Sequence, residues 1–169
     1  MSEAVADEGM LPADVHDFSK TTLSIRPGFL IRRLHQIHLA LFAEECAAFG
    51  VTPVQYSIMS VVLLQPRIDQ ARLGYEVGVD RATLTNVIGR LETRGLVRRS
   101  KKATDKRTNL VKLTARGEAV LEKMAEAVQR AHARTIEPLS AEDQQRFLDY
   151  LNRLVDAGNE YSRAPLRIA

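Results

Sequence analysis

The residues from Asp69 to Val111, DQARLGYEVGVDRATLTNVIGRLETRGLVRRSKKATDKRTNLV, decide the fold that the sequence predicts. Asp69 can cap a helix of about two turns over Gln70–Val77, Gly78 supplies a tight turn, and Asp80 caps a second helix. Two basic strands joined by a charged tip follow. A helix, a turn, a second helix and a hairpin in this order predict a winged helix-turn-helix, whose second helix fits the major groove of DNA.

The second helix separates apolar from polar residues. Its apolar positions recur at helical spacing and should face the core: Leu84, Val87, Ile88 and Leu91. The outer face carries short polar side chains and two arginines. Because arginine pairs with guanine and asparagine with adenine in the major groove, the candidates for base reading are Arg81, Asn86 and Arg90. Thr83 and Thr85 are candidates for contacts with thymine methyls or phosphates.

Basic residues concentrate in this module. From Arg81 to Arg116 there are seven Arg and four Lys against Glu92 and Asp105, a net charge of +9, whereas the whole chain carries +3 and its remainder −6. This asymmetry is typical of a protein that contacts the DNA backbone, although a solvated basic face would give the same count. With the helix-turn-helix pattern it favours double-stranded DNA, and the candidates for neutralising phosphates are Arg98, Arg99, Lys101 and Lys102.

Length and composition indicate a globular protein of one domain, or one domain with a helical annex. The chain has 169 residues, 45% of them hydrophobic. No apolar run approaches the roughly eighteen residues of a membrane-spanning helix, and the acidic N-terminus does not resemble a signal peptide. We therefore expect a cytoplasmic protein without membrane contacts. The lone Cys46 cannot form an internal disulfide, in agreement with a reducing compartment.

The segments around the module are predicted to be helical. Residues 1–24 form a polar, acidic arm that we expect to be flexible or to strap a partner subunit. A helix then starts near Pro27 and ends at Gly50, and another covers about Pro53–Leu64. After the wing, Thr114 caps a long helix that Pro138 interrupts, and Ser140 caps a last one.

The last two helices have apolar faces without a partner nearby in the sequence. Because two-fold dimers place two recognition helices about one DNA turn apart, we expect a homodimer on a near-palindromic operator. An intramolecular bundle is the alternative. The predicted fold is mainly α, a winged helix-turn-helix with a small β-hairpin wing and terminal helices that form a dimerisation domain. Its predicted parts are an arm (1–24), N-terminal dimer and ligand-cleft helices (25–66), the DNA-binding domain (67–114) and C-terminal dimerisation helices (115–169).

Five short stretches are specific when taken together, in this order and spacing: 52–56 (TPVQY), 79–85 (VDRATLT), 90–97 (RLETRGLV), 105–107 (DKR) and 111–117 (VKLTARG). Through these stretches the chain resembles, from Pro27 to Tyr161, the MarR family of bacterial transcriptional regulators. The resemblance implies a dimeric repressor or activator whose terminal helices make the dimer and whose hold on DNA is altered by a small ligand.

The resemblance also implies roles for particular residues. The outer face of the second helix would meet base edges and phosphates in the major groove: Arg81, Thr83, Thr85, Asn86 and Arg90. Arg107, assisted by Lys106, would reach the neighbouring minor groove or its phosphates. Many members carry Asp-Pro where this chain has Lys102-Ala103. The wing is therefore more basic, and an internal salt bridge that would orient Arg107 is in doubt.

A ligand cleft is implied where the first helices meet the DNA module and the dimer helices. The candidates combine aromatic and cationic groups: Arg32, Arg33, His35, His38, Phe42, Tyr56 and Met59. Such a mixture suits an aromatic carboxylate or an aryl-coenzyme A thioester. The amino-acid sequence of the first predicted helix is also similar to that of regulators of aromatic-acid breakdown. The alternative is that His38 is a core or interface histidine and that the two arginines are solvated.

Other sensing mechanisms and other classes of protein have less support. His35 and His38 make only half of a zinc site, so neither a metal nor another cofactor is expected. Cys46 is either an oxidation sensor or a buried, inert thiol.

The sequence lacks a Gly-rich phosphate loop, a paired-histidine metalloprotease motif and a Gly-x-Ser-x-Gly elbow, which argues against an enzyme. An architectural DNA binder without ligand control and a helical interaction module remain alternatives.

Overall fold

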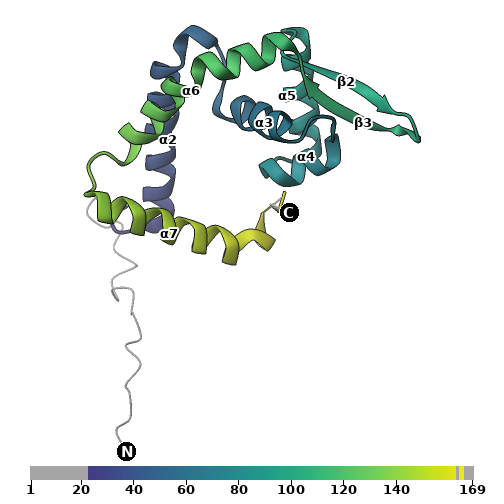
Figure 1. Cartoon of the computed structure of the whole chain (residues 1–169). Coiled ribbons are helices and arrows are strands. Elements are labelled where there is room, and N and C mark those ends of the chain that lie inside the picture. Colours follow the sequence, from purple (N-terminus) through teal and green to yellow (C-terminus); the bar gives the residue numbers. More distant parts are fainter. Residues whose placement is uncertain (1–22, 163, 166–169) are drawn as a thin grey trace, which may run out of the picture. The chain divides into compact units, whose positions relative to one another are not determined.

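The computed structural model of the protein describes residues 23–162, 164 and 165 (Figure 1), so the predicted N-terminal arm lies almost wholly outside the described residues. The chain divides into two compact units, a small one that ends at Ile37 and a large one that begins at His38. The elements are the helices α2 (Pro27–Glu45), α3 (Pro53–Leu64), α4 (Gln70–Val77), α5 (Arg81–Thr93), α6 (Ala115–Ile136) and α7 (Ala141–Gly158), the strands β1 (Ile68–Asp69), β2 (Val97–Lys102) and β3 (Asp105–Leu113), and the short 3-10 helices η1 (Ala47–Phe49) and η2 (Asn159–Tyr161).

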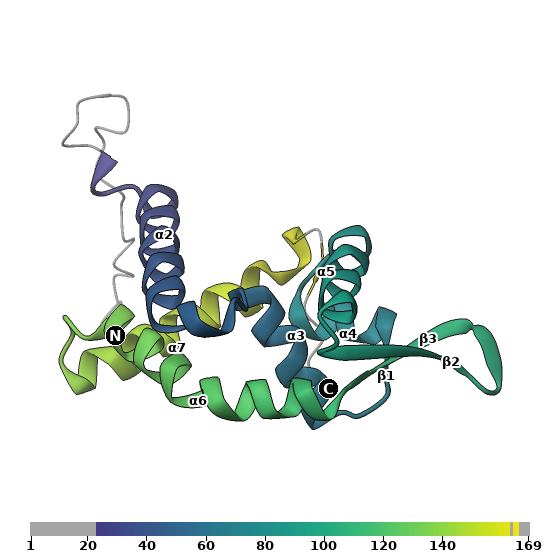
Figure 2. The ribbon, with the colours of Figure 1, turned by 90° about the horizontal axis from the view of Figure 1, so that it is seen from above.

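This order confirms the predicted winged helix-turn-helix. In Figures 1 and 2, α3, α4 and α5 gather at the root of the β2–β3 hairpin, which projects beyond them as the wing. The start of α4 is fixed by Asp69, whose Oδ1 accepts hydrogen bonds from the amides of Ala71 (2.7 Å) and Arg72 (3.2 Å). Gly78 ends α4 in the left-handed conformation, with φ of +63°, which glycine adopts without steric cost.

Three local details differ from the sequence-based expectation. Helix α2 ends at Glu45 rather than at Gly50, because the 3-10 turn η1 intervenes before the left-handed Gly50. The charged tip, expected from the sequence over Lys101 to Lys106, is shorter, because the wing strands extend into it and leave only Ala103 and Thr104 between them. Strand β1 was not predicted, since two residues are too few for a recognisable alternation.

The sheet has the antiparallel order β1-β3-β2. Ile68 pairs with Val111, and Val97 pairs with Leu113 at the root of the hairpin. A register shift between Lys101 and Lys102 marks the tip. The root residues are buried whereas the tip is exposed, so the wing is anchored at one end only.

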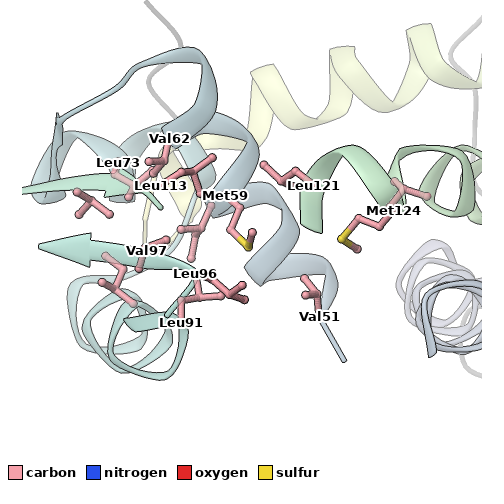
Figure 3. Close-up of a cluster of buried hydrophobic side chains, with 14 of the residues drawn as sticks. Val51, Met59, Val62, Leu73, Leu91, Leu96, Val97, Leu113, Leu121 and Met124 are labelled. Atoms are coloured by element: carbon pink, nitrogen blue, oxygen red, sulfur yellow. The ribbon is translucent and has the colours of Figure 1, made fainter. Parts of the chain in front are cut away.

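Side chains from several elements meet in one core. Figure 3 shows Met59 of α3, Leu73 of α4 and Leu91 of α5 pointing into a common apolar cluster with Val97 of β2 and Met124 of α6. All five side chains are at most 1% exposed. Helix α5 is therefore held from behind by the sheet root and by neighbouring helices.

The junction between wing and α6 is closely packed. Thr114 caps α6 by accepting from the amide of Gly117 (3.1 Å), and its hydroxyl donates to the carbonyl of Gly95 (2.6 Å). A Cβ on Gly117 would lie 2.1 Å from the Leu96 carbonyl oxygen. Only glycine allows this approach of backbone to backbone.

Helix α7 is the contrast to this core. Ser140 caps it, as predicted, through the amide of Asp143 (3.2 Å), but none of its residues is buried. Leu148, Leu154 and Val155 remain 43%, 64% and 53% exposed. No helix within the described ranges combines the length and the apolar character needed to cross a bilayer.

Candidate nucleic-acid interface

Helix α5 presents the polar face that its sequence predicts. Leu84, Ile88 and Leu91 are buried and Val87 is half-buried, which orients the helix. The opposite face is exposed and carries every residue predicted to read bases or to contact phosphates from this helix: Arg81, Thr83, Thr85, Asn86 and Arg90. Two guanidinium groups and an amide are thus available on one helical face.

Asp80 fixes the start of this helix. Its Oδ1 accepts from the amides of Ala82 and Thr83, both at 3.0 Å. The Thr83 hydroxyl donates to the other carboxylate oxygen at 2.6 Å. This hydroxyl bond, followed by the backbone bond, holds the pKa of Asp80 below its ordinary value. The only hydroxyl proton of Thr83 is therefore used within the protein, and towards DNA its oxygen can only accept.

Thr85 has a structural role as well. Its hydroxyl donates to the carbonyl of Arg81 (2.8 Å) and accepts from Nε2 of Gln70 at the start of α4 (3.1 Å). The bond links the two helices of the motif. Thr85 therefore offers DNA mainly its methyl group, and Gln70 is a positioning residue that no local pattern singled out.

The wing tip is organised by Asp105 through main-chain and hydroxyl groups. Its Oδ1 accepts from the amide of Arg107 (2.9 Å), and its Oδ2 accepts from the Thr108 hydroxyl (2.7 Å). The hydroxyl bond is the largest cause of the lowered pKa of Asp105. The Arg107 guanidinium makes no ion pair with the described part of the chain, so the tip is ordered without the salt bridge that was in doubt. The other predicted wing contacts are also exposed: Arg98, Lys101, Lys102 and Lys106.

Arg99 corrects one prediction from the sequence. Instead of extending towards phosphates, its guanidinium donates twice to Oε2 of Glu92 on α5, from Nε at 2.9 Å and Nη2 at 2.6 Å. Its amide donates to Oε1 at 3.0 Å. The amide bond and then the guanidinium bonds lower the pKa of Glu92. Arg99 joins the recognition helix to the wing because α5 packs beside β2.

Helix and wing meet at a cavity of about 480 Å³ between α4, α5 and β3. Arg81 from the helix and Arg107 from the wing line the same cavity, together with Tyr75. Ala164 and Pro165 from the C-terminal segment also reach its wall. Folding thus places two arginines that are far apart in the sequence on one continuous surface.

A second arginine, besides Arg99, positions the C-terminal end of α5. Arg94, which directly follows the helix, donates from Nη1 to the carbonyl of Gly50 (2.6 Å) and from Nη2 to that of Phe49 (2.8 Å). These are the carbonyls that end η1. Sequence reasoning missed this contact, since its two ends are more than forty residues apart.

The small unit contains three of the predicted ligand residues, all exposed. The guanidinium of Arg32 lies 5.3 Å from the centre of the Phe29 ring. Arg33 donates to Oε1 of Gln36 at 3.0 Å. His35 is the third. The contacts of Arg32 with the Phe29 ring and of Arg33 with Gln36 are made within α2 and at its surface. Both guanidinium groups therefore remain accessible.

The other four predicted ligand residues lie in the large unit. His38 stacks on His132 with ring centres 5.2 Å apart, and its Nδ1 lies 2.9 Å from the Thr135 hydroxyl. Because that hydroxyl donates to the carbonyl of Ala131, it accepts from Nδ1, which therefore carries a proton. His38 is half-buried and paired, in agreement with the alternative of a core or interface histidine.

Aromatic contacts continue from His38 towards α3. The Phe42 ring centre lies 6.2 Å from that of His38 and 6.3 Å from that of Tyr56, both edge to face. Phe42 and Met59 are 1% and 0% exposed, so they belong to the core, whereas Tyr56 is half-buried. Of this group, His38 and Tyr56 keep surface that a ligand can contact.

The end of α2 is held by ion pairs and is followed directly by the cysteine. Glu45 accepts from Arg130 (2.8 Å) and Arg134 (2.7 Å) of α6, and these bonds lower its pKa. Cys46 is 2% exposed, and burial raises the pKa of its thiol. A thiol of this kind is a poor nucleophile, which favours the inert alternative. Within the described segments, no three His, Cys, Asp or Glu residues cluster as metal ligands would.

Comparison with known proteins identifies the family of the chain. Residues 51–108, which include the helix-turn-helix and most of the wing, match the family model described as the MarR family. The chain is 34% identical over 126 residues to the transcriptional regulator HosA of Escherichia coli O127:H6, covering 75% of this chain and 92% of HosA. It is 28% identical over 130 residues to the HTH-type transcriptional repressor NicR of Pseudomonas putida, covering 77% and 82%.

Solved structures give the same result. PcaV of Streptomyces coelicolor, a transcriptional regulator in complex with its natural ligand, is similar with a TM-score of 0.73 and 32% identity over 80% of this chain and 96% of PcaV. A MarR variant of E. coli bound to operator DNA has a TM-score of 0.71 and 30% identity, over 81% and 98%. BpsR of Bordetella bronchiseptica, whose DNA binding is regulated by 6-hydroxynicotinic acid, has a TM-score of 0.75 and 27% identity, over 79% and 95%.

Proposed function

Since the chain belongs to the MarR family of transcriptional regulators, we propose that it is a homodimeric repressor that a small aromatic effector releases from a near-palindromic operator. The proposal rests above all on one observation. Arg81, at the start of the exposed polar face of α5, and the wing arginine Arg107 line the same cavity, which supports helix and wing engaging one DNA duplex together. This family consists of regulators, so the expectation that the chain is not an enzyme is confirmed.

In the proposed complex the residues divide into base readers and phosphate contacts. Arg81, Asn86 and Arg90 have the side chains suited to guanine and adenine edges in the major groove. Thr85 contributes its methyl group and Thr83 an acceptor oxygen. Arg107 and Lys106 reach the neighbouring minor groove or its phosphates, and the sequence-independent affinity comes from Arg98, Lys101 and Lys102.

The proposed dimer uses the terminal helices, with residues 115–169 as the C-terminal part. Helix α7 supports this assignment because its large apolar side chains lack cover: Leu148, Leu154 and Val155. A second copy that covers them by two-fold symmetry would also present a second α5 to the next major groove.

The proposed effector is an aromatic carboxylate, with an aryl-coenzyme A thioester as the larger alternative. Support for this effector class comes from a similar protein, because 6-hydroxynicotinic acid regulates DNA binding by BpsR. The name of NicR, a transcriptional repressor, supports the proposed repressor role. In this chain the exposed guanidinium groups of Arg32 and Arg33 are suited to a carboxylate or to phosphates. His38 and Tyr56 supply partly open aromatic surface. His35 is exposed and stays a candidate, whereas Phe42 and Met59 are core residues and are not proposed to contact the effector.

The test is a fluorescence-anisotropy titration against the intergenic DNA upstream of the gene and against scrambled DNA. It is run with and without 6-hydroxynicotinic acid, other aromatic acids and their coenzyme A thioesters. The proposal predicts tight binding to the upstream DNA and release by one compound. Equal binding to both DNAs would indicate an architectural protein, and no binding to either would refute DNA regulation through this face.

The wing is tested by Arg107→Ala. Loss of the guanidinium should weaken operator binding by about 1 to 3 kcal/mol. Lys123→Ala, which removes one exposed charge from α6, is the matched control and should bind as the parent protein does. Unchanged binding by Arg107→Ala would remove the wing from the footprint.

A further inference from the structure

A second basic surface lies outside the α5 face. The segment from Gln65 to Asp69 and the wing tip border an open cavity of about 560 Å³. Three cationic side chains line it, and each comes from a different element: Arg67 from the loop after α3, Arg72 from α4 and Lys102 from β2. Among the described residues that line it, Asp69 is the one acidic residue, and its Oδ1 is occupied by the amides at the start of α4.

The backbone of Arg67 is unusual. Among the described residues it is the only non-glycine with a positive φ, at +67°. A residue with a Cβ is strained in this left-handed region, whereas glycine is not. Glycine would therefore suit the turn better than arginine does. A strained position points to a function of the side chain rather than of the turn.

The side chains are placed to meet a partner. Arg67 is exposed and has no hydrogen bond or ion pair with the part of the chain that the structure describes. Arg72 is fixed through Nε, which donates to Oε1 of Glu76 at 2.8 Å, and Glu76 also accepts from Gln65 at 2.5 Å. The bond to Glu76 orients the Arg72 guanidinium while its Nη donors remain for another acceptor.

The geometry points to a phosphodiester-binding site in which Arg67 and Arg72 continue, along the DNA backbone, the row of phosphate contacts that Lys102 begins. This inference rests on the proposed function, since it requires the wing to lie against DNA. Two features favour a DNA backbone over a free anion. The cations lie on an exposed surface, Arg72 with 55% of its side chain accessible, and they come from three separate parts of the chain, as contacts to successive phosphates would.

Arg67→Gly tests the inference, because it removes the cation while glycine adopts the left-handed backbone conformation of this position without strain. We expect its melting temperature to be equal to or above that of the parent protein. Binding should weaken by about the same factor on upstream and on scrambled DNA, since phosphates carry no sequence information. The slope of log K against log salt should fall by about 0.9 for each phosphate that a subunit no longer neutralises. A residue that only shaped the turn would leave that slope unchanged.

Two controls accompany it. Arg67→Lys keeps the charge and should keep most of the salt slope, because lysine also binds phosphate. Lys123→Ala removes a charge outside the site and should keep the whole slope. The inference is overturned if Arg67→Gly binds DNA with the parent affinity and slope.

The remaining outcomes separate this inference from the proposed function and from a free ligand. If Arg107→Ala weakens binding and Arg67→Gly does not, the wing still binds DNA and only the second site is wrong. If neither substitution weakens DNA binding, the DNA contacts proposed for the wing are wrong as well. Calorimetry with free coenzyme A provides the last comparison. Loss of its binding in Arg67→Gly with an unchanged salt slope would assign the cavity to a free phosphate group and refute the DNA contact.

Discussion

The helix-turn-helix segment and helix α7 belong to the same chain but differ in how far each buries its own apolar side chains. In the first, Leu73, Leu84 and Leu91 are at most 1% exposed. In α7 no residue is buried, and Leu154 is 64% exposed. Because an amphipathic helix gains most of its stability from packing its apolar face, the contrast teaches that the DNA-facing part buries its apolar side chains within the chain, whereas α7 leaves its own exposed, as the proposed dimer interface would need.

The largest effect is expected from charging the open face of α7. In the double variant Leu148→Asp, Leu154→Asp, two carboxylates would have to be desolvated in the proposed dimer interface. We expect a monomer by light scattering and a loss of operator affinity of at least a hundredfold, since both half-sites are no longer bound together. A fold change of this size corresponds to about 2.7 kcal/mol.

The control on the same helix is Asn152→Asp, which adds a carboxylate at an exposed polar position and should keep the dimer. If the double variant remained a dimer with parent affinity, the contrast between the two regions would not concern dimerisation.

The next effect tests how tightly the DNA-facing part is packed. Gly117→Ala would place a Cβ 2.1 Å from the Leu96 carbonyl oxygen, and the backbone would have to shift. We expect a loss of about 3 kcal/mol in the free energy of unfolding, measured in urea.

Gly89→Ala is its matched counterpart. Gly89 lies in α5, and a Cβ there meets nothing within 4 Å. Alanine should therefore stabilise the helix, by up to about 1 kcal/mol. Equal effects of the two substitutions would contradict the close packing at the start of α6.

A smaller effect is expected at the bond between helix and wing. Glu92→Gln removes the carboxylate that Arg99 binds at 2.6 and 2.9 Å. Both side chains are about one third exposed, so the loss of unfolding free energy should not exceed about 1 kcal/mol at neutral pH.

The pH dependence of this loss has a definite sign. The bonds from Arg99 lower the pKa of Glu92 in the folded protein below the ordinary value of 4.5. The carboxylate therefore adds stability above about pH 4.5, and this stability disappears as the pH falls through the lowered folded pKa. Parent and Glu92→Gln stabilities should converge in acid; a constant difference down to pH 2 would rule out this carboxylate as the cause.

The smallest effect is expected from oxidation. Cys46 is 2% exposed and burial raises the pKa of its thiol, so hydrogen peroxide should change operator affinity by less than about twofold. Release of DNA by peroxide from the parent protein, but not from Cys46→Ala, would instead support the redox-responsive alternative.

Much of the fold could be predicted because its signals are local. The caps formed by Asp69, Asp80, Thr114 and Ser140 act on amides two or three residues away, and the structure places a helix start at each of them. Strand β1 depends instead on pairing with residues that follow it by about forty positions. Its two residues carry no pattern of their own, so no reading of the sequence could have found it.

The candidate site shows the same division. The polar face of α5 followed from helical spacing, and the basic wing from its composition. The roles of Arg99 and Arg94 did not, because each depends on which acceptor the packing brings within reach: Glu92 for Arg99, and the carbonyls of Phe49 and Gly50 for Arg94. An arginine in a basic stretch gives no local sign of whether it faces solvent or a carboxylate.

The sequence by itself determined the order of the elements, the starts of the helices and the side chains that α5 exposes, since caps and periodicity act over a few residues. Only the tertiary structure decided that Arg81 and Arg107 share one cavity and that Arg67 and Arg72 share another with Lys102. It also left α7 without a buried residue. These properties depend on how elements pack, and packing is set by contacts between residues that are distant in the chain.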